Sequence, residues 1–112
     1  MYERKTPIDF SCPLRLTLSF MGPKWNTCIL DELRRGPLRP SQLHRALPAA
    51  TPRVLNMQLK ELEADGLVRK VIYPELPPRS EYYITELGES LLPIIDAMTE
   101  WGERHRECFD KK

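Results

Sequence analysis

The sequence predicts a mainly α-helical fold with one small β-hairpin, an α+β arrangement, and three observations support this fold class. The chain has 112 residues, a length typical of a single domain. Prolines and glycines divide it into short segments, and the apolar residues of most segments recur with helical spacing. One later segment is instead rich in β-branched residues and is followed by a proline-rich turn and a return segment, the pattern of a hairpin.

The first helix is expected to begin after Cys12, because Pro13 occupies the first helical position, where proline is favoured. Gly22 and Pro23 end it. Its apolar residues alternate with period two, which on its own favours a strand, but the signals at both ends favour a helix. Residues 1–11 precede this helix and are expected to form a flexible arm.

Three further helices are expected at short intervals. Residues 24–35 place their apolar side chains on one helical face, and residues 40–47 form a short helix. Thr51 then caps a third helix with Pro52 at its first position, and Gly66 ends it. The last two helices are joined by a very short turn, which is the helix-turn-helix arrangement.

The hairpin and the last helix complete the predicted fold. Residues 67–73 and 80–84 form two strands, and the tip between them is stiffened by three prolines. A hairpin in this position is a wing, so residues 1–112 are predicted to form a single winged helix-turn-helix domain. Thr85 caps the last helix, residues 86–108, and Pro93 is expected to kink it.

The helix that Thr51 caps has the features of a DNA-reading helix. Leu55, Leu59 and Leu62 form its buried stripe, so the polar residues opposite project together. An α-helix fits the major groove of B-DNA, where arginine binds guanine and asparagine binds adenine. The alternative, for such a helix taken alone, is a polar face that is merely solvated. We expect contacts to double-stranded DNA from Arg39, Thr51, Pro52, Arg53, Asn56, Met57 and Lys60.

Arg79 is the candidate DNA contact of the wing. It follows Pro77 and Pro78, and such prolines reduce the entropy that the tip loses when it meets DNA. An arginine there can enter the minor groove, where negative potential is concentrated. The alternative is that Arg79 pairs with Glu75 or Glu81 inside the hairpin.

The apolar stripe of the last helix is wider than one small domain can easily cover, which indicates a homodimer. A two-fold axis would place two recognition helices about 34 Å apart, one turn of DNA, and the dimer would read a palindromic operator. The alternative is that the last helix packs only on its own domain. The expected dimer contacts are on the first and last helices: Leu14, Leu18, Leu91, Ile95, Met98 and Trp101.

Three cysteines lie far apart in the chain, which argues against a disulfide framework or a structural zinc site. Cys12 is the expected N-cap of the first helix, and a helix N-terminus favours a thiolate, the form that oxidants and electrophiles attack. Cys12 is therefore a candidate redox-sensing residue. An ordinary surface cysteine is the alternative.

The sequence contains no glycine-rich phosphate loop, no paired nucleophile and base, and no metal-ligand spacing, so we expect neither an enzyme nor a cofactor or metal. It also lacks a membrane-spanning apolar run and a secretory signal, which favours a cytoplasmic location. The net charge is only +1, which leaves open a winged-helix module that binds protein and not DNA. A small-molecule effector is left open too, because no residue pattern identifies one.

Six motifs are distributed over roughly residues 12–102. They are Cys12-Pro13, Gly22-Pro23-Lys24-Trp25, Asp65-Gly66-Leu67-Val68, the wing string from Tyr73 to Tyr82, Thr85-Glu86-Leu87-Gly88 and Trp101-Gly102. Together they resemble the HxlR family of bacterial and archaeal regulators. The resemblance implies a winged-helix dimer, built through the first and last helices, that represses or activates transcription.

The resemblance also implies roles for single residues. It places Arg79 at the wing position, and in some family members the N-terminal cysteine, here Cys12, senses electrophiles or oxidants. The chain departs from the family at Pro40, where an aromatic residue is usual, and at Met57, where a polar residue is common. The operator sequence therefore does not follow from the resemblance. The implied base-reading stretch contains Thr51, Arg53, Asn56 and Met57.

Overall fold

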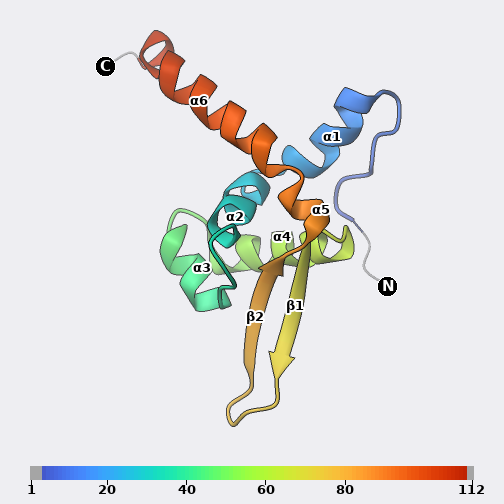
Figure 1. The fold of residues 1–112 in the computed structure, drawn as a ribbon, viewed down its shortest axis with the longest axis vertical. Helices are drawn as coiled ribbons and strands as arrows, with labels where there is room; N and C mark the ends of the chain where they lie inside the picture. The colour runs from blue at the N-terminus through green and yellow to red at the C-terminus, as the bar shows by residue number, and fades with distance from the viewer. Residues whose placement is uncertain (1–3, 111–112) are drawn as a thin grey trace.

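The computed structural model describes residues 4–110 and confirms the mainly α-helical fold with one hairpin. Figure 1 shows α2, α3 and α4 together at the centre, with the hairpin extending on one side and α6 on the other. This arrangement is the predicted winged helix-turn-helix. The elements are α1 (Pro13–Met21), α2 (Asn26–Leu33), α3 (Pro40–Ala46), α4 (Pro52–Ala64), β1 (Val68–Tyr73), β2 (Arg79–Ile84), α5 (Glu86–Glu89) and α6 (Leu92–Phe109).

The helices α1 and α4 begin at the residues that the sequence predicts. Cys12 is the N-cap of α1, and its Sγ accepts a hydrogen bond from the Arg15 backbone N at 3.5 Å. Thr51 is the N-cap of α4, and its Oγ1 accepts from the Val54 backbone N at 3.2 Å. A proline opens each helix. The alternating apolar residues of α1 therefore do not make a strand, because the capped start and the Gly22 end fix a helix.

One hydrophobic core holds the helix-turn-helix together. The three leucines expected to form the stripe of α4 are all buried, and they pack with leucine and isoleucine side chains of α2. Leu43 of α3 and Val68 of β1 close this core from two sides. The buried stripe fixes the rotation of α4, so its opposite face points away from the domain.

The hairpin of β1 and β2 is antiparallel, with a register that runs from Val68 opposite Ile84 to Tyr73 opposite Arg79. Its base is fastened to the domain, because Leu38 and Tyr82 exchange two backbone hydrogen bonds of 3.1 and 2.9 Å. Arg79 is thus the first residue of β2, whereas the sequence pattern predicts it in the tip.

The last helix differs from the prediction. The expected single helix over residues 86–108 is divided at Ser90 and Leu91 into the short α5 and the long α6. Pro93 does not kink a helix, because it lies in the first turn of α6, where the missing N–H has no helical partner to lose. Arg34, the C-cap of α2, pairs with Asp96 near the start of α6, with Nη2 and Oδ1 2.6 Å apart. The rest of α6 projects from the domain (Figure 1).

Residues 4–11 of the expected flexible arm lie against the domain, whereas residues 1–3 are outside the described part of the chain. The backbone N of Asp9 donates to Ser19 Oγ at 2.9 Å, and the backbone N of Lys5 donates to Glu61 Oε2 at 3.1 Å. The arm therefore joins α1 to the second half of α4.

Candidate DNA-binding surface

The outer face of α4 presents Arg53, Asn56 and Lys60 to solvent. None of the three is engaged in an ion pair within residues 4–110. Thr51 and Pro52 are exposed at the N-terminus of the same helix. This face therefore combines a guanidinium, an amide and an ammonium group, which suit guanine, adenine and phosphate respectively.

A groove of about 480 Å³ runs between α3 and the first turn of α4. Arg45 of α3 and Asn56 of α4 both line it, so the positive charge of α3 adjoins the polar face of the recognition helix. Arg39 is exposed at the N-cap of α3, where its backbone N donates to Gln42 Oε1 at 2.8 Å. These positions suit contacts to the phosphates that flank a major groove.

Met57 does not share this face. It is half-buried, and it lines a cavity of about 220 Å³ together with the arm residues Lys5 and Thr6 and with Pro23 and Gln58. The structure thus places Met57 beside the arm and not among the residues that reach outward. Helical geometry explains the difference, because Met57 lies at the margin of the outer face, where the arm covers α4.

Arg79 is engaged inside the hairpin, which is the alternative that the sequence left open. Its Nη2 lies 2.9 Å from Glu75 Oε2, and its Nη1 lies 2.6 Å from Glu81 Oε2. The guanidinium also lies 4.1 Å from the ring centroid of Tyr73. Hydrogen bonding from Arg79, with the positive charges of Arg79 and Arg39, lowers the pKa of Glu75. A contact from Arg79 to DNA would require these pairs to break.

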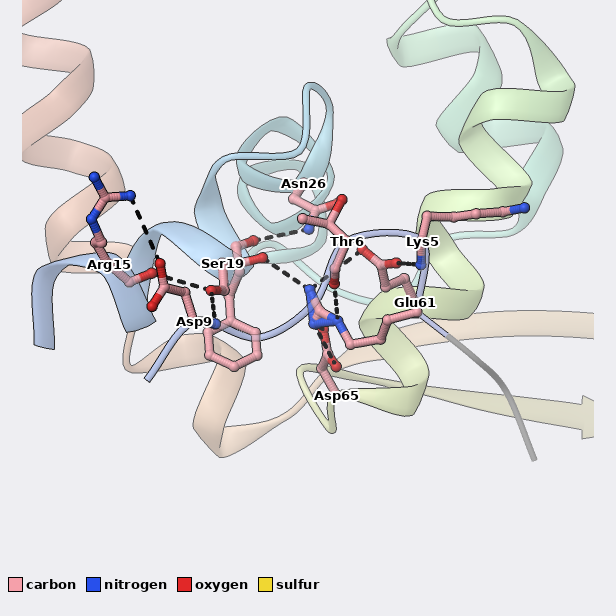
Figure 2. Close-up of polar contacts among 10 residues, drawn as sticks. Lys5, Thr6, Asp9, Arg15, Ser19, Asn26, Glu61 and Asp65 are labelled. Carbon is pink, nitrogen blue, oxygen red and sulfur yellow. Dashed lines mark hydrogen bonds and ion pairs between the residues drawn. The ribbon is translucent and has the colours of Figure 1, made fainter. Parts of the chain in front are cut away.

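The contact between the N-terminal arm and the end of α4 was not predicted from the sequence. Arg4 Nη1 lies 3.1 Å from Asp65 Oδ2, and Arg4 Nη2 lies 3.6 Å from Glu61 Oε1. Arg4 Nη2 also donates to the Ser19 carbonyl oxygen at 3.0 Å, and the guanidinium lies 5.4 Å from the Phe20 ring centroid. Figure 2 shows how Glu61 of α4 and Asp65, the C-cap of that helix, converge with Ser19 of α1 at this point. The sequence signals are a basic residue in the arm and two acids at the end of α4, Glu61 and Asp65.

Cys12 is exposed at the start of α1, as expected for an N-cap. Cys108 is exposed near the end of α6, and Cys28 is half-buried in α2. All three are free thiols. The position of Cys12 combines access for a reagent with the positive end of a helix dipole.

The six expected dimer residues divide into two groups. Leu14 and Trp101 are 70% and 58% exposed, and Leu18 and Met98 are also exposed, so these four leave a large apolar surface on α1 and α6. Ile95, by contrast, is 4% exposed and belongs to the core, and Leu91 is half-buried against it. Ile95 thus lies apart from this apolar surface, because the first turn of α6 packs on its own domain. The dimer contacts remain a prediction.

Two absences hold for the part of the chain that the structure describes. Residues 4–110 contain no cluster of three histidine, cysteine or acidic side chains that could hold a metal ion. None of their helices has the length and apolarity needed to cross a bilayer.

Comparison with known proteins identifies the family. The model of the HxlR-like helix-turn-helix family matches residues 20–109. The chain is 38% identical to YdeP of Bacillus subtilis strain 168, an uncharacterized HTH-type transcriptional regulator, over 99% of this chain and 91% of YdeP. It is 44% identical to YkvN of the same strain, also an uncharacterized HTH-type transcriptional regulator, over 88% of this chain and 83% of YkvN.

A solved structure agrees with the sequence relatives. The redox regulator HypR in its oxidized form superposes with a TM-score of 0.79 at 42% identity, covering 83% of this chain and 96% of HypR. The relatives are regulators and not enzymes. The matched region contains the whole helix-turn-helix and the wing. The chain therefore belongs to the HxlR-like helix-turn-helix family and is a DNA-binding regulator of transcription.

Proposed function

We propose that the protein acts in the cytoplasm as a homodimer that reads a palindromic operator through α4. The observation that supports this proposal most directly is the outer face of α4, where Arg53, Asn56 and Lys60 are exposed and unpaired within residues 4–110. The buried leucine stripe holds that face outward. Arg53 and Asn56 lie in the N-terminal half of α4, the half of a recognition helix that usually meets the bases.

The base-reading role is tested with DNA selected from a random pool. Arg53→Ala should weaken operator binding by about 1–3 kcal/mol and relax selectivity at one base pair. Lys60→Ala should weaken all sequences alike and lower the salt dependence of binding by about one counterion. Arg104→Ala is the control, because it removes an equal charge from the projecting part of α6, where the side chain pairs with Glu100. A DNA affinity that does not change with salt concentration, or equal losses of affinity for Arg53→Ala and Arg104→Ala, would contradict the proposal.

The exposed apolar residues of α1 and α6 support the homodimer. Leu14, Leu18, Met98 and Trp101 present more apolar surface than scattered exposed residues require, and a second copy of the chain would cover it. Sedimentation equilibrium should give twice the chain mass for the native protein. Trp101→Lys should give monomers that bind a half-site far more weakly than the dimer binds the full operator. A native monomer at micromolar concentration would refute this part.

Cys12 is proposed to make DNA binding responsive to oxidants or electrophiles. The relative HypR is a redox regulator whose structure is known in an oxidized and a reduced form. In this chain Cys12 is exposed, and only two residues separate it from Asp9, the arm residue that is bonded to Ser19. A modified thiol at the N-cap would disturb both the first turn of α1 and the arm that reaches α4.

The sensor role is tested with diamide. This reagent accepts two electrons and two protons as the Cys12 thiols of the two copies form one disulfide, and it becomes a hydrazine. Treatment should alter operator binding of the native protein and of Cys28→Ser and Cys108→Ser, and thiol reduction should reverse the change. Cys12→Ser should not respond. A Cys12→Ser protein that responds like the native protein would rule Cys12 out.

A further inference from the structure

The tip of the wing carries an apolar side chain that has no partner in the domain. Leu76 is 99% exposed, the highest exposure among the large hydrophobic residues that are exposed in the structure. It lies between β1 and β2, where the hairpin reaches farthest from the helices (Figure 1). Packing within the domain cannot account for a leucine at this position.

The tip is held in a fixed shape around Leu76. Pro74, Pro77 and Pro78 restrict the backbone on both sides of it. Arg79 links the turn to β2, because it pairs with Glu75 in the turn and with Glu81 in β2. These pairs also neutralise the guanidinium beside the tip. The hairpin therefore presents a rigid, apolar end, and its positive charge is turned inward.

The tip is continuous with the DNA-binding surface. A hollow of about 450 Å³ lies between the N-terminus of α3 and the wing, and Leu76 lines it together with Arg39, Pro40 and Ser41. Arg39 is close enough to Glu75 to lower the pKa of that carboxyl, after the larger effect of the hydrogen bond from Arg79. A duplex seated on α3 and α4 would thus have the tip of the wing at its margin.

We propose that Leu76, and not Arg79, is the residue with which the wing enters the minor groove of the operator. This inference rests on the proposed DNA-reading function. Leucine and proline are among the apolar side chains that insert into minor grooves. The floor of an A·T pair is free of the guanine 2-amino group, so an apolar side chain fits deeper there. Leu76 would therefore favour A·T pairs in the flanks of the operator, outside the bases that α4 reads.

The first experiment measures operator affinity over a range of salt concentrations. Leu76→Ala and Leu76→Ser should each weaken binding about tenfold, the loss expected for removing a buried leucine side chain. The slope of affinity against salt should stay unchanged, because an apolar contact releases no counterions, whereas Arg39→Ala should lower that slope. Leu87→Ser is the matched control, since Leu87 is an exposed leucine of α5, at the other end of the hairpin from the tip.

The second experiment locates the contact in the minor groove. Hydroxyl-radical footprinting of the native complex should show protected sugars in the two flanks, and Leu76→Ser should lose this protection while the centre stays protected. A G·C pair placed in a flank should weaken native binding. Replacing its guanine with inosine, which lacks the 2-amino group, should restore the affinity of the native protein. The affinity of Leu76→Ser should not change with this replacement.

The outcomes separate this inference from the function on which it rests. If the native protein binds no selected DNA, both the DNA-reading function and the role of Leu76 are refuted. If the native protein binds the operator, and Leu76→Ser keeps the native affinity and flank protection, only the role of Leu76 is refuted. That role also falls if Arg79→Gln removes the flank protection and Leu76→Ser does not. Because Leu76 is fully exposed, the melting temperature of its variants should equal that of the native protein, so lost binding would not reflect lost folding.

Discussion

The cluster that joins the arm to α4 predicts a large effect from one substitution near the N-terminus. Arg4→Met would remove a guanidinium that faces two carboxylates, those of Glu61 and Asp65. The side chains of the three residues are 12%, 6% and 5% exposed respectively. Methionine keeps most of the volume and the contact with Phe20, so the substitution tests the charge more than the packing.

The size of the effect follows from the burial of the cluster. Breaking a buried ion pair by removing one partner costs about 3–5 kcal/mol, because the other charge stays without compensation. The low end, about 3 kcal/mol, applies here, because the arm can detach and let water reach the two carboxylates. For a domain of this size, roughly 4 °C of melting temperature corresponds to each kcal/mol, so we expect a decrease of roughly 12 °C.

The assay is thermal and urea unfolding at a fixed protein concentration. Lys5→Met is the matched control, because only the backbone N of Lys5 reaches Glu61, and its side chain is exposed. This control should melt within a degree or two of the native protein. The double variant Arg4→Met with Asp65→Asn should recover part of the loss, because it also removes one of the two uncompensated charges.

The pH dependence gives a second measure of the same cluster. Burial raises the pKa of Asp65 above its ordinary value of 3.8, the charge of Arg4 opposes this rise, and the charge of Glu61 adds to it. A raised pKa in the folded state means that ionisation of Asp65 destabilises the fold, with no penalty at low pH and the full penalty above the raised pKa. Without Arg4 that penalty grows. The stability difference between native protein and Arg4→Met should therefore be largest near neutral pH and shrink toward about pH 4.

Two results would refute this reasoning. The first is an Arg4→Met protein that melts with the native protein at neutral pH, which would mean that the arm contributes nothing to stability. The second is a loss of stability that does not change with pH, which would mean that packing of Arg4, and not its charge, stabilises the cluster.

Three further predictions concern single contacts. Thr51→Ala should lower the free energy of unfolding by about 1 kcal/mol, because it removes the cap of α4; Thr51→Asn should restore most of it in urea titrations, and equal losses would argue against capping. Gly88→Ala should lower the melting temperature by several degrees, because its Cβ would clash with the Leu67 carbonyl oxygen; an unchanged melting temperature would mean that α5 shifts freely. The hydrogen bond with Tyr73, and after it burial and Glu81, raise the pKa of Tyr83 to about 12. In Tyr73→Phe this pKa should therefore fall part of the way toward 10, as read from phenolate absorbance, and an unchanged titration would mean that burial and Glu81 account for the shift.

The sequence predicted well those features that local signals determine. The start of α4 depends on Thr51 and Pro52, which are adjacent in the chain, and its rotation depends on leucines three and four residues apart. The break before α6 was missed for a local reason too. Pro93 is compatible with either a kinked helix or a new first turn, and the packing of Ile95 in the core decides for the latter.

The features that the sequence did not predict depend on partners chosen in three dimensions. Arg4 and Asp65 are 61 positions apart, and no spacing rule connects an arm residue to the end of a helix. For Arg79 the sequence left open whether the guanidinium pairs with acids or contacts DNA, and the fold places Glu75 in the turn and Glu81 two residues along β2 within its reach. No acid or aromatic ring of the hairpin covers Leu76, which stays 99% exposed.

The net charge of +1 is a poor guide to DNA binding here, because two sets of basic residues differ in their partners. One set is neutralised within the fold by nearby acids, and it includes Arg4, Arg34 and Arg79. The other set has no ion pair within residues 4–110 and lies on the helix-turn-helix, at Arg39, Arg45, Arg53 and Lys60. A duplex at this face responds mainly to charges within about 10 Å, since salt screens the rest. The local charge that DNA meets is therefore strongly positive even though the acids elsewhere bring the total close to zero.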